Sequence, residues 1–326
     1  AYSRSQGLYL ANMNKIKAFF KLVRWTNLLM IALMMLLVYY CLMSPLFTSG
    51  IAAVMPPAPA FLLLVLSLVF IVAGGYVIND IFDVDIDRIN KPERLLVTTV
   101  FSEKEARIFY NVLTLIGLLA ALGASVMIAK TKFFTLFAIL LLLVGVLYSY
   151  SSTYKKKLVV GNLIVSLSVA FSVFLPWLFE MIYLSNNVLV LSLSKNIMME
   201  ILPYVMIYTV FAFLMNFIRE ILKDAEDLKG DSVTHCRTIP IVYGTKKMNM
   251  ILLVLAILVY VLLLYFMIDL WKIKSYITLG IIFFIWNTFP VMFFNLFVKN
   301  VNVNYHSYSV FYKVMMLFGV LSMIFI

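Results

Sequence analysis

Long hydrophobic blocks alternate with short polar connections along the whole of this chain. Each block is close to the roughly 20 residues that a helix needs to cross the hydrocarbon core of a bilayer. Apolar runs of this length, with few charges, are typical of membrane-spanning helices. The pattern predicts nine such helices, near residues 28–43, 61–78, 108–129, 133–150, 160–183, 200–218, 248–268, 275–294 and 308–326.

The composition agrees with this pattern. The chain has 326 residues, of which 64% are hydrophobic and 13% are charged, and its mean hydropathy is +1.03. A typical soluble domain carries about 25% charged residues, so the low charged fraction of this chain excludes a soluble globular protein. We therefore expect an all-α polytopic membrane protein, with residues 1–27 as a basic cytoplasmic leader and residues 28–326 as the transmembrane domain.

The Lys and Arg residues predict an orientation. If the N-terminus is cytoplasmic, the cytoplasmic segments hold 21 of the 26 Lys and Arg residues, and the external segments hold five. This bias is the positive-inside signal of a multi-pass protein. It accounts for the net charge of +11 and favours contact with anionic membrane lipids, not with nucleic acid. We expect the protein in the cell membrane, with its functional site facing the cytoplasm.

The most distinctive polar segment follows the second predicted span. Residues 79–87 contain four aspartates and an asparagine. Carboxylates this close to hydrocarbon are costly, and they mark functional sites. On a continuous helix, Asn79, Asp83 and Asp87 would lie on one face. Without a cation such a ladder of carboxylates repels itself, so the pattern indicates an oxygen-rich site for a divalent metal.

A second acidic cluster follows the sixth predicted span. Glu220, Asp224, Asp227 and Asp231 are spaced four, three and four residues apart, which again places them on one helical face. The two clusters lie about 140 residues apart along the chain. We expect them to meet in the fold as two halves of one site.

Two acidic faces among Lys and Arg at a membrane surface suit a diphosphate bridged by Mg2+. The carboxylates hold the metal, while the metal and the basic side chains neutralise the phosphate oxygens. The natural ligand with a diphosphate head and a long hydrocarbon tail, which would lie among apolar helices, is a prenyl diphosphate. Ionisation of its C–O bond leaves an allylic cation and pyrophosphate, and a water-poor cavity protects the cation. These features predict a Mg2+-dependent prenyltransferase.

The spacing Asn79-Asp80-x-x-Asp83-x-x-x-Asp87 is similar to the NDxxDxxxD signature of the UbiA superfamily of intramembrane prenyltransferases. The resemblance implies nine helices bundled around a central cavity, Mg2+ as cofactor and a prenyl diphosphate as donor. It implies catalytic roles, in most cases as metal ligands, for Asn79, Asp80, Asp83, Asp87, Asp224, Asp227 and Asp231. It also implies substrate contacts for Arg24, Asn27, Arg94 and Tyr148.

The second cluster resembles one branch of this family more than the others. Lys223-Asp224-x-Glu226-Asp227-x-x-Gly230-Asp231, followed by Arg237-Thr238-Ile239-Pro240, is similar to the branch that includes digeranylgeranylglyceryl phosphate synthases and chlorophyll synthases. The branch implies geranylgeranyl diphosphate as donor and geranylgeranylglyceryl phosphate as acceptor. An aromatic acceptor in quinone biosynthesis, of the hydroxybenzoate or dihydroxynaphthoate type, is the alternative. After Arg94 the chain departs from the family, because Leu95-Leu96 and Thr98-Thr99-Val100 replace its usual Pro and Ser-Gly-Arg elements.

A phosphorylated acceptor needs positive charge of its own, because the metals are engaged by the donor. We assign Arg24, Lys223 and Arg237 to the acceptor and Arg94 to the donor, since a guanidinium binds phosphate oxygens in pairs. Lys155–Lys157 are interpreted as an anchor at the lipid headgroups.

Other functions fit the sequence less well. A cation-coupled transporter would hold its carboxylates near the midplane of the bilayer, whereas these follow the ends of spans. A CDP-alcohol phosphatidyltransferase requires Gly-x-x-Ala-Arg after its second Asp, and here Val84-Asp85-Ile86 follows Asp83. Asp85 and Glu226 point off the acidic faces and are expected to contact solvent or loops. Two cysteines and two histidines give no zinc-ligand spacing, and no obligatory protein partner is indicated.

Overall fold

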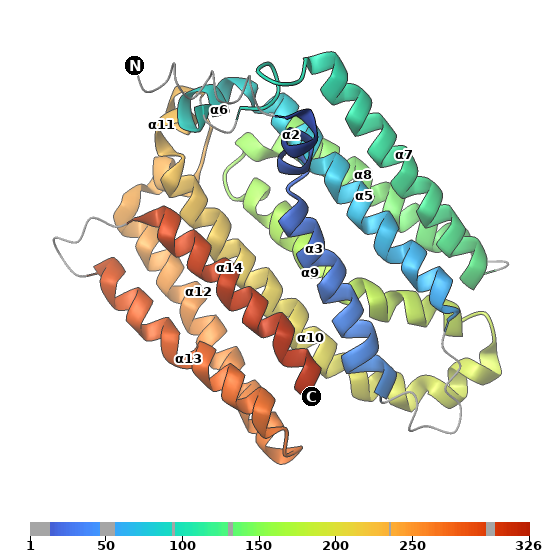
Figure 1. Cartoon of the computed structure of the whole chain (residues 1–326). Helices are drawn as coiled ribbons and strands as arrows, with labels where there is room; N and C mark the ends of the chain where they lie inside the picture. Colours follow the sequence, from blue (N-terminus) through green and yellow to red (C-terminus); the bar gives the residue numbers. More distant parts are fainter. Residues whose placement is uncertain (1–13, 46–55, 93–94, 130–132, 235, 298–303) are drawn as a thin grey trace. The chain divides into compact units, whose positions relative to one another are not determined.

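Helices account for most of the residues that the structure describes. The computed structural model describes residues 14–45, 56–92, 95–129, 133–234, 236–297 and 304–326. Apart from an isolated bridge between Val97 and Phe101, its elements are α-helices with short 3-10 and π segments. The chain divides into two compact units, and Figure 1 shows the helices coloured along the sequence.

The first unit is built from three stretches of the chain: Ala1–Leu33, Pro56–Gly161 and Lys229–Arg237. Its elements are α2 (Lys15–Leu22), the start of α3 (Trp25–Leu37), α5 (Ala58–Phe82), α6 (Val84–Asn90), α7 (Glu103–Ile128), α8 (Phe133–Ser152), the 3-10 turn η3 (Tyr154–Lys156) and most of α11 (Leu228–Val233). Helices α5, α7 and α8 pack against one another, and α7 begins at a capping box formed by Ser102 and Glu105.

Helices α5 and α7 approach so closely that one glycine has no space for a side chain. A Cβ on Gly117 would lie 2.8 Å from Ile71 Cγ1, 3.0 Å from the Ile71 backbone nitrogen and 3.1 Å from the Ser67 carbonyl oxygen. Two of these three atoms belong to the backbone of α5, which cannot rotate away as a side chain can. The contact sets the position of the helix that carries the first acidic cluster.

We expect Gly117→Ala to lower the free energy of unfolding by about 1–3 kcal/mol, because the new methyl overpacks this contact. Gly145→Ala in α8 is the matched control, since a Cβ there meets no atom within 4 Å and alanine favours the helix. Thermal unfolding in detergent compares the two variants with the parent protein. Equal stability of both variants would contradict the close approach of α5 and α7.

The second unit comprises Met34–Met55, Asn162–Leu228 and Thr238–Ile326. Its elements are the π-helical turn η1 (Val38–Met43), most of α9 (Val160–Leu184), α10 (Val188–Glu226), α12 (Ile239–Lys272), α13 (Tyr276–Phe297), α14 (Tyr305–Ser322) and the 3-10 turn η4 (Met323–Phe325). Helix α10 packs on both α12 and α14, and a hydrogen bond of 2.8 Å joins Tyr208 Oη of α10 to Ser322 Oγ of α14. Helix α10 therefore supports the second acidic cluster from the core of this unit.

Each of the nine predicted spans coincides with a helix of the described residues. Eight are long and apolar enough to cross a membrane, and the apolar stretch Tyr276–Pro290 is shorter. The largest difference concerns α10, which begins at Val188 and not near residue 200. Its start is capped by Asn187, whose Oδ1 accepts from the Leu189 and Val190 backbone nitrogens at 3.0 and 3.3 Å.

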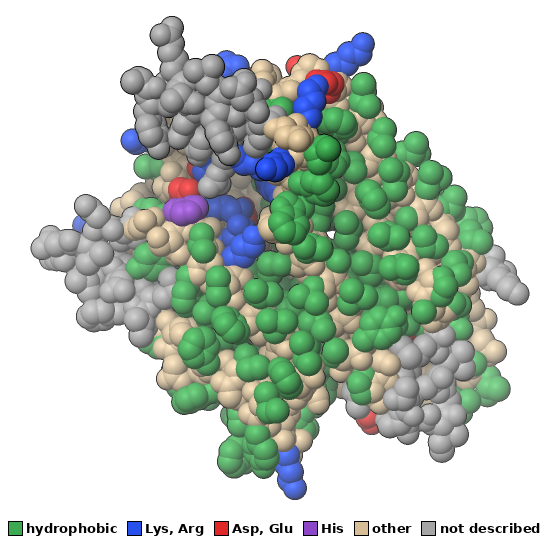
Figure 2. Space-filling view, viewed as in Figure 1, with side chains coloured by type: hydrophobic (Ala, Val, Ile, Leu, Met, Phe, Trp, Pro, Cys, Tyr) green, Lys and Arg blue, Asp and Glu red, His purple; other side chains and the backbone are tan. Residues whose placement is uncertain are grey.

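Much of the outer surface of these helices is apolar. Leu119 and Val126 of α7 and Leu142 of α8 are each more than half exposed, and Figure 2 shows a face on which hydrophobic side chains predominate. Water would disfavour such a surface, whereas lipid tails accommodate it. The surface agrees with a multi-pass membrane protein.

Candidate active site

Both acidic clusters lie where a long helix ends and a short helix begins. Helix α5 ends at Asp83 (φ −92°, ψ 2°), and α6 follows. Helix α10 ends at Asp227 (φ −90°, ψ 9°), and α11 follows. These dihedral angles lie in the sparsely populated bridge region, where many active-site residues are found. The expectation of two uninterrupted helical faces is therefore wrong at these two aspartates, because the helix breaks at each of them.

The first cluster keeps helical spacing across its break. The Asp83 backbone nitrogen donates to the Asn79 carbonyl at 2.9 Å, and that of Asp87 donates to the Asp83 carbonyl at 2.8 Å. Asn79 Nδ2 also donates to Asp83 Oδ2 at 2.6 Å. Asp83 is buried, and Asp85 lies off this group with 86% of its side chain exposed. The structure thus brings Asn79 and Asp83 into contact, with Asp87 one turn further on.

Lys155 forms an ion pair with Asp83, which corrects its interpretation as a headgroup anchor. Its Nζ donates to Asp83 Oδ2 from the turn η3. Burial acts to lower the pKa of Lys155, but the charges of Asp83, Tyr150 and Asp87, together with the hydrogen bond to Asp83, outweigh this effect, and the net pKa is raised. Lys155 is therefore a firm positive charge inside the first acidic cluster. A run of three lysines beside a span does not indicate which of them contacts the acidic cluster.

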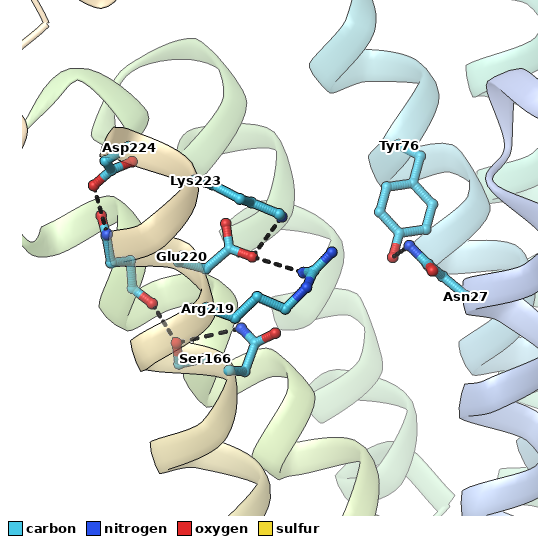
Figure 3. Close-up of polar contacts among 9 residues, drawn as sticks. Asn27, Tyr76, Ser166, Arg219, Glu220, Lys223 and Asp224 are labelled. Carbon is cyan, nitrogen blue, oxygen red and sulfur yellow. Dashed lines mark hydrogen bonds and ion pairs between the residues drawn. The ribbon is translucent and has the colours of Figure 1, made fainter. Parts of the chain in front are cut away.

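Arg24 joins the same cluster from the N-terminal side. Its Nη2 donates to Asp80 Oδ1 at 2.7 Å, and its guanidinium carbon lies 4.6 Å from the centre of the Tyr76 ring. Asn27 Nδ2 donates to Tyr76 Oη at 3.3 Å (Figure 3). The sequence assigned Arg24 to the acceptor, whereas this contact places it at the motif expected to hold the donor.

The surroundings of Asp87 change the pKa of its carboxyl group. Burial, and then the nearby charge of Asp83, raise the pKa of Asp87 to about 6. In the metal-free protein Asp87 is therefore largely protonated below that pH and ionised above it. A proton and a divalent metal ion would compete for the same carboxylate oxygen atoms.

We expect the affinity for Mg2+ to fall as the pH drops below about 6, by about tenfold per pH unit where one proton must leave. Isothermal titration of Mg2+ between pH 5 and 8 measures this dependence. Asp87→Asn should weaken binding at pH 8 and flatten the profile between pH 5 and 6. A profile of unchanged slope in that variant would assign the proton to another group.

The second cluster is held by contacts to α9 and α14. Asp224 accepts a hydrogen bond of 2.7 Å from Asn162 Nδ2 of α9, and Ser166 Oγ donates to the Asn162 carbonyl at 2.6 Å (Figure 3). Glu226 Oε1 lies 3.2 Å from His306 Nδ1 of α14. Glu226 thus contacts the first turn of α14, whereas the sequence predicted a contact with solvent or a loop. The contact between Asn162 and Asp224 is seen in the structure alone.

The last part of the second cluster returns to the first unit. The Gly230 backbone nitrogen donates to Asn90 Oδ1 at 2.6 Å, and a Cβ on Gly230 would lie 2.4 Å from that oxygen. Asp231, the next residue, is buried. Nearby, the Arg237 backbone nitrogen donates to the Lys156 carbonyl at 3.1 Å. The ends of the two motifs, 140 residues apart in sequence, therefore meet at α6 and α11.

The other predicted substrate residues differ in their exposure and in their contacts. Tyr148 of α8 packs edge to face with Phe82 at the end of α5, with ring centres 5.9 Å apart. The Arg237 side chain is exposed, and Lys223 Nζ donates to Glu220 Oε1 at 2.6 Å. Arg94 lies outside the described residues.

The oxygen atoms of the first cluster suit a hard divalent cation. Asn79 Oδ1 is buried with no hydrogen-bond partner, and Asp83 and Asp87 supply carboxylates nearby. An oxygen-only set of this kind matches the preference of Mg2+. Within the described ranges, no three Asp, Glu, His or Cys side chains already converge on one point at metal-binding distance, and Lys155 holds one oxygen of Asp83.

Comparison with known proteins agrees with this chemistry. Residues 41–296 match the UbiA prenyltransferase family. The chain belongs to this family. It is thus a UbiA-type prenyltransferase and a multi-pass integral membrane protein. The prediction of a prenyltransferase with an all-helical membrane fold is confirmed.

Individual members of the UbiA family resemble the chain along most of its length. A digeranylgeranylglyceryl phosphate synthase of Sulfurisphaera tokodaii is 32% identical over 235 residues, which cover 71% of this chain and 72% of that protein. A solved structure concerning a digeranylgeranylglyceryl phosphate synthase in membranes is 26% identical, with a TM-score of 0.61, over 96% of this chain and 98% of its own. A UbiA homolog from Archaeoglobus fulgidus, bound to DMAPP and Mg2+, is 17% identical over 94% of this chain and 98% of its own, with a TM-score of 0.52, and supports the fold.

Proposed function

We propose that this UbiA-family enzyme transfers a geranylgeranyl group from geranylgeranyl diphosphate to geranylgeranylglyceryl phosphate. The observation that carries the proposal is the similarity to digeranylgeranylglyceryl phosphate synthases over most of the chain. The pattern from Lys223 to Asp231, followed by Thr238-Ile239-Pro240, supports the same branch.

The two acidic clusters are the proposed donor site. Bound Mg2+ would neutralise the diphosphate and stabilise it as a leaving group. The proposed metal ligands are oxygen atoms of Asn79, Asp83, Asp87, Asp224, Asp227 and Asp231. Mg2+ binding in a UbiA homolog supports this cofactor.

The basic residues of the first cluster have their own part in this proposal. Arg24 and Lys155 already lie against Asp80 and Asp83, so they bring positive charge to where the diphosphate would bind. Arg94 is proposed as a further donor contact, with Asn27 and Tyr148 beside the prenyl chain. As the donor C–O bond breaks, a hydroxyl oxygen of the acceptor forms the new C–O bond and loses its proton, and pyrophosphate leaves. Apolar side chains of the spans exclude water, which would otherwise capture the allylic cation.

The proposed orientation places the Lys-rich ends of the spans, and with them both acidic clusters, in the cytoplasm. The bias of the Lys and Arg residues supports it. Residues 1–27 are proposed to remain on that side, ahead of a transmembrane domain that covers residues 28–326.

The test is an acceptor panel. Purified protein is incubated with Mg2+, labelled geranylgeranyl diphosphate and one acceptor at a time: geranylgeranylglyceryl phosphate, hydroxybenzoate or dihydroxynaphthoate. We expect a prenylated product with the glyceryl phosphate only. A product with an aromatic acceptor, and none with the glyceryl phosphate, would overturn the proposal.

A further inference from the structure

A hydrogen bond from α9 holds one carboxylate of the second acidic cluster. Asn162, in the first turn of α9, donates from Nδ2 to Asp224 Oδ2 at 2.7 Å. A hydrogen bond to an ionised carboxylate is short and strong. It restricts the rotation of the carboxylate group, so the direction of the second oxygen, Oδ1, is restricted with it.

The first acidic cluster contains a contact of the same kind. Asn79 Nδ2 donates to Asp83 Oδ2 at 2.6 Å, from four residues earlier on the same helix. In the second cluster the residue four positions before Asp224 is Glu220. Its carboxylate accepts from Lys223 at 2.6 Å, and an ionised carboxylate has no proton to donate. The second cluster therefore obtains its amide donor from a neighbouring helix, α9.

Further hydrogen bonds join the same two helices. Asn216 Nδ2 of α10 donates to Ser166 Oγ of α9 at 3.3 Å, and Ser166 Oγ donates to the Asn162 carbonyl at 2.6 Å (Figure 3). Ser166 and Asn216 are both buried. Neither of these bonds involves a carboxylate. They hold α9 against α10 and offer a comparison for the contact that does reach the acidic cluster.

We propose that Asn162 is a positioning residue for Asp224. Its amide fixes Asp224 Oδ2, so that Oδ1 is held in one direction for a divalent cation. The inference rests on the proposed function, in which Asp224 is a metal ligand. A hydrogen-bond partner of a metal ligand raises the affinity for the metal, because the ligand is oriented before the metal arrives. An amide suits this purpose, because it is neutral and leaves the negative charge of the carboxylate in place.

This role predicts a particular change in the response to Mg2+. Mg2+ requires nearly octahedral geometry, so a ligand that must first rotate into place costs part of the binding free energy. At saturating Mg2+ the carboxylate of Asp224 would take up the same position even without the amide. Loss of the amide should therefore raise the Mg2+ requirement and change kcat little. A residue that only holds α9 against α10 would affect stability instead.

The test measures the binding of Mg2+ by isothermal titration, without donor or acceptor. We expect Asn162→Ala to weaken Mg2+ binding by about ten- to a hundred-fold. Asn162→Gln, which keeps an amide donor, should recover part of the affinity. In turnover assays of Asn162→Ala, the Mg2+ concentration for half the maximal rate should rise by a similar factor. The kcat at saturating Mg2+ should stay within about threefold of the parent value.

Ser166→Ala is the matched control, because it removes hydrogen bonds between the same two helices and leaves the Asn162–Asp224 contact in place. Both variants should lower the unfolding temperature in chelator, since each loses hydrogen bonds. Ser166→Ala should keep the Mg2+ affinity within about twofold of the parent value.

Two results would overturn the inference: an unchanged Mg2+ affinity in Asn162→Ala, or an equal loss of affinity in Asn162→Ala and Ser166→Ala. Failure of the proposed function gives a different result. If the parent protein prenylated none of the acceptors but Asn162→Ala alone weakened Mg2+ binding, the proposed function would fail and the positioning role would stand.

Discussion

Asp83→Asn is expected to lower kcat by about a hundred- to a thousand-fold, the effect of removing one preorganised electrostatic group from an active site. The change removes a carboxylate from the centre of the first acidic cluster, where Asn79 and Lys155 both contact it. Initial rates at saturating Mg2+, donor and acceptor measure the loss. Asp227→Asn, at the corresponding helix junction of the second unit, should cause a similar loss.

Asp85→Asn is the matched control for Asp83→Asn. Asp85 lies two residues away but has 86% of its side chain exposed, so its replacement should leave kcat within about twofold of the parent value. Near-parental activity of Asp83→Asn at saturating Mg2+ would show that Asp83 is no metal ligand.

The structure also changes the expected effect of Asp83→Asn on the stability of the metal-free protein. From the sequence alone, removing one carboxylate from a repelling ladder would stabilise the metal-free protein. In the structure Asp83 is the partner of Lys155, so its loss leaves a largely buried ammonium group without its counter-charge. We therefore expect a lower unfolding temperature, which Lys155→Met in the same chain should partly restore.

Removal of the divalent metal is expected to abolish turnover completely. Without Mg2+, the leaving diphosphate would keep its charge in a water-poor site, where charge stabilisation matters most. Mg2+ should restore the rate after chelation. Ca2+ should restore it poorly, because it is larger and takes six to eight ligands in looser geometry.

The protein should remain folded during this experiment, because Arg24 and Lys155 pair with Asp80 and Asp83 in the metal-free protein. The unfolding temperature in chelator is thus the control for a loss of structure. Turnover that continues at the full rate in excess EDTA would refute the proposed mechanism.

The spans and the acidic clusters could be predicted from the sequence, because both are local patterns. The length of an apolar run indicates a membrane-spanning helix. A carboxylate near hydrocarbon indicates a functional site whatever its tertiary contacts are. Even the exposure of Asp85 follows from its position between the aspartates of one helical face. These features depend on residues close together in the sequence.

The contacts that organise the site could not be predicted in the same way. Lys155 and its neighbours are identical lysines in a row, and only the turn η3 determines that Lys155 contacts Asp83. Arg219 is one of many basic residues in the chain, and its spacing of four residues from Lys223 places both on one face of a helix. Burial of its Nε depends on how α10 packs with its neighbours. The helix breaks at Asp83 and Asp227 have no glycine or proline to mark them.

The contact between Asn90 and Gly230 bears on how the protein is made. The part of the first unit that precedes Gly161 emerges from the ribosome long before residues 229–237, which complete that unit. During this interval, as domains fold from the N-terminal side, two more spans must be inserted before Gly230 can reach Asn90. The nascent chain already carries Arg24 and Lys155, which pair with Asp80 and Asp83. Two of the four aspartates in the first cluster are therefore balanced by basic side chains of the same unit before residues 229–237 are made.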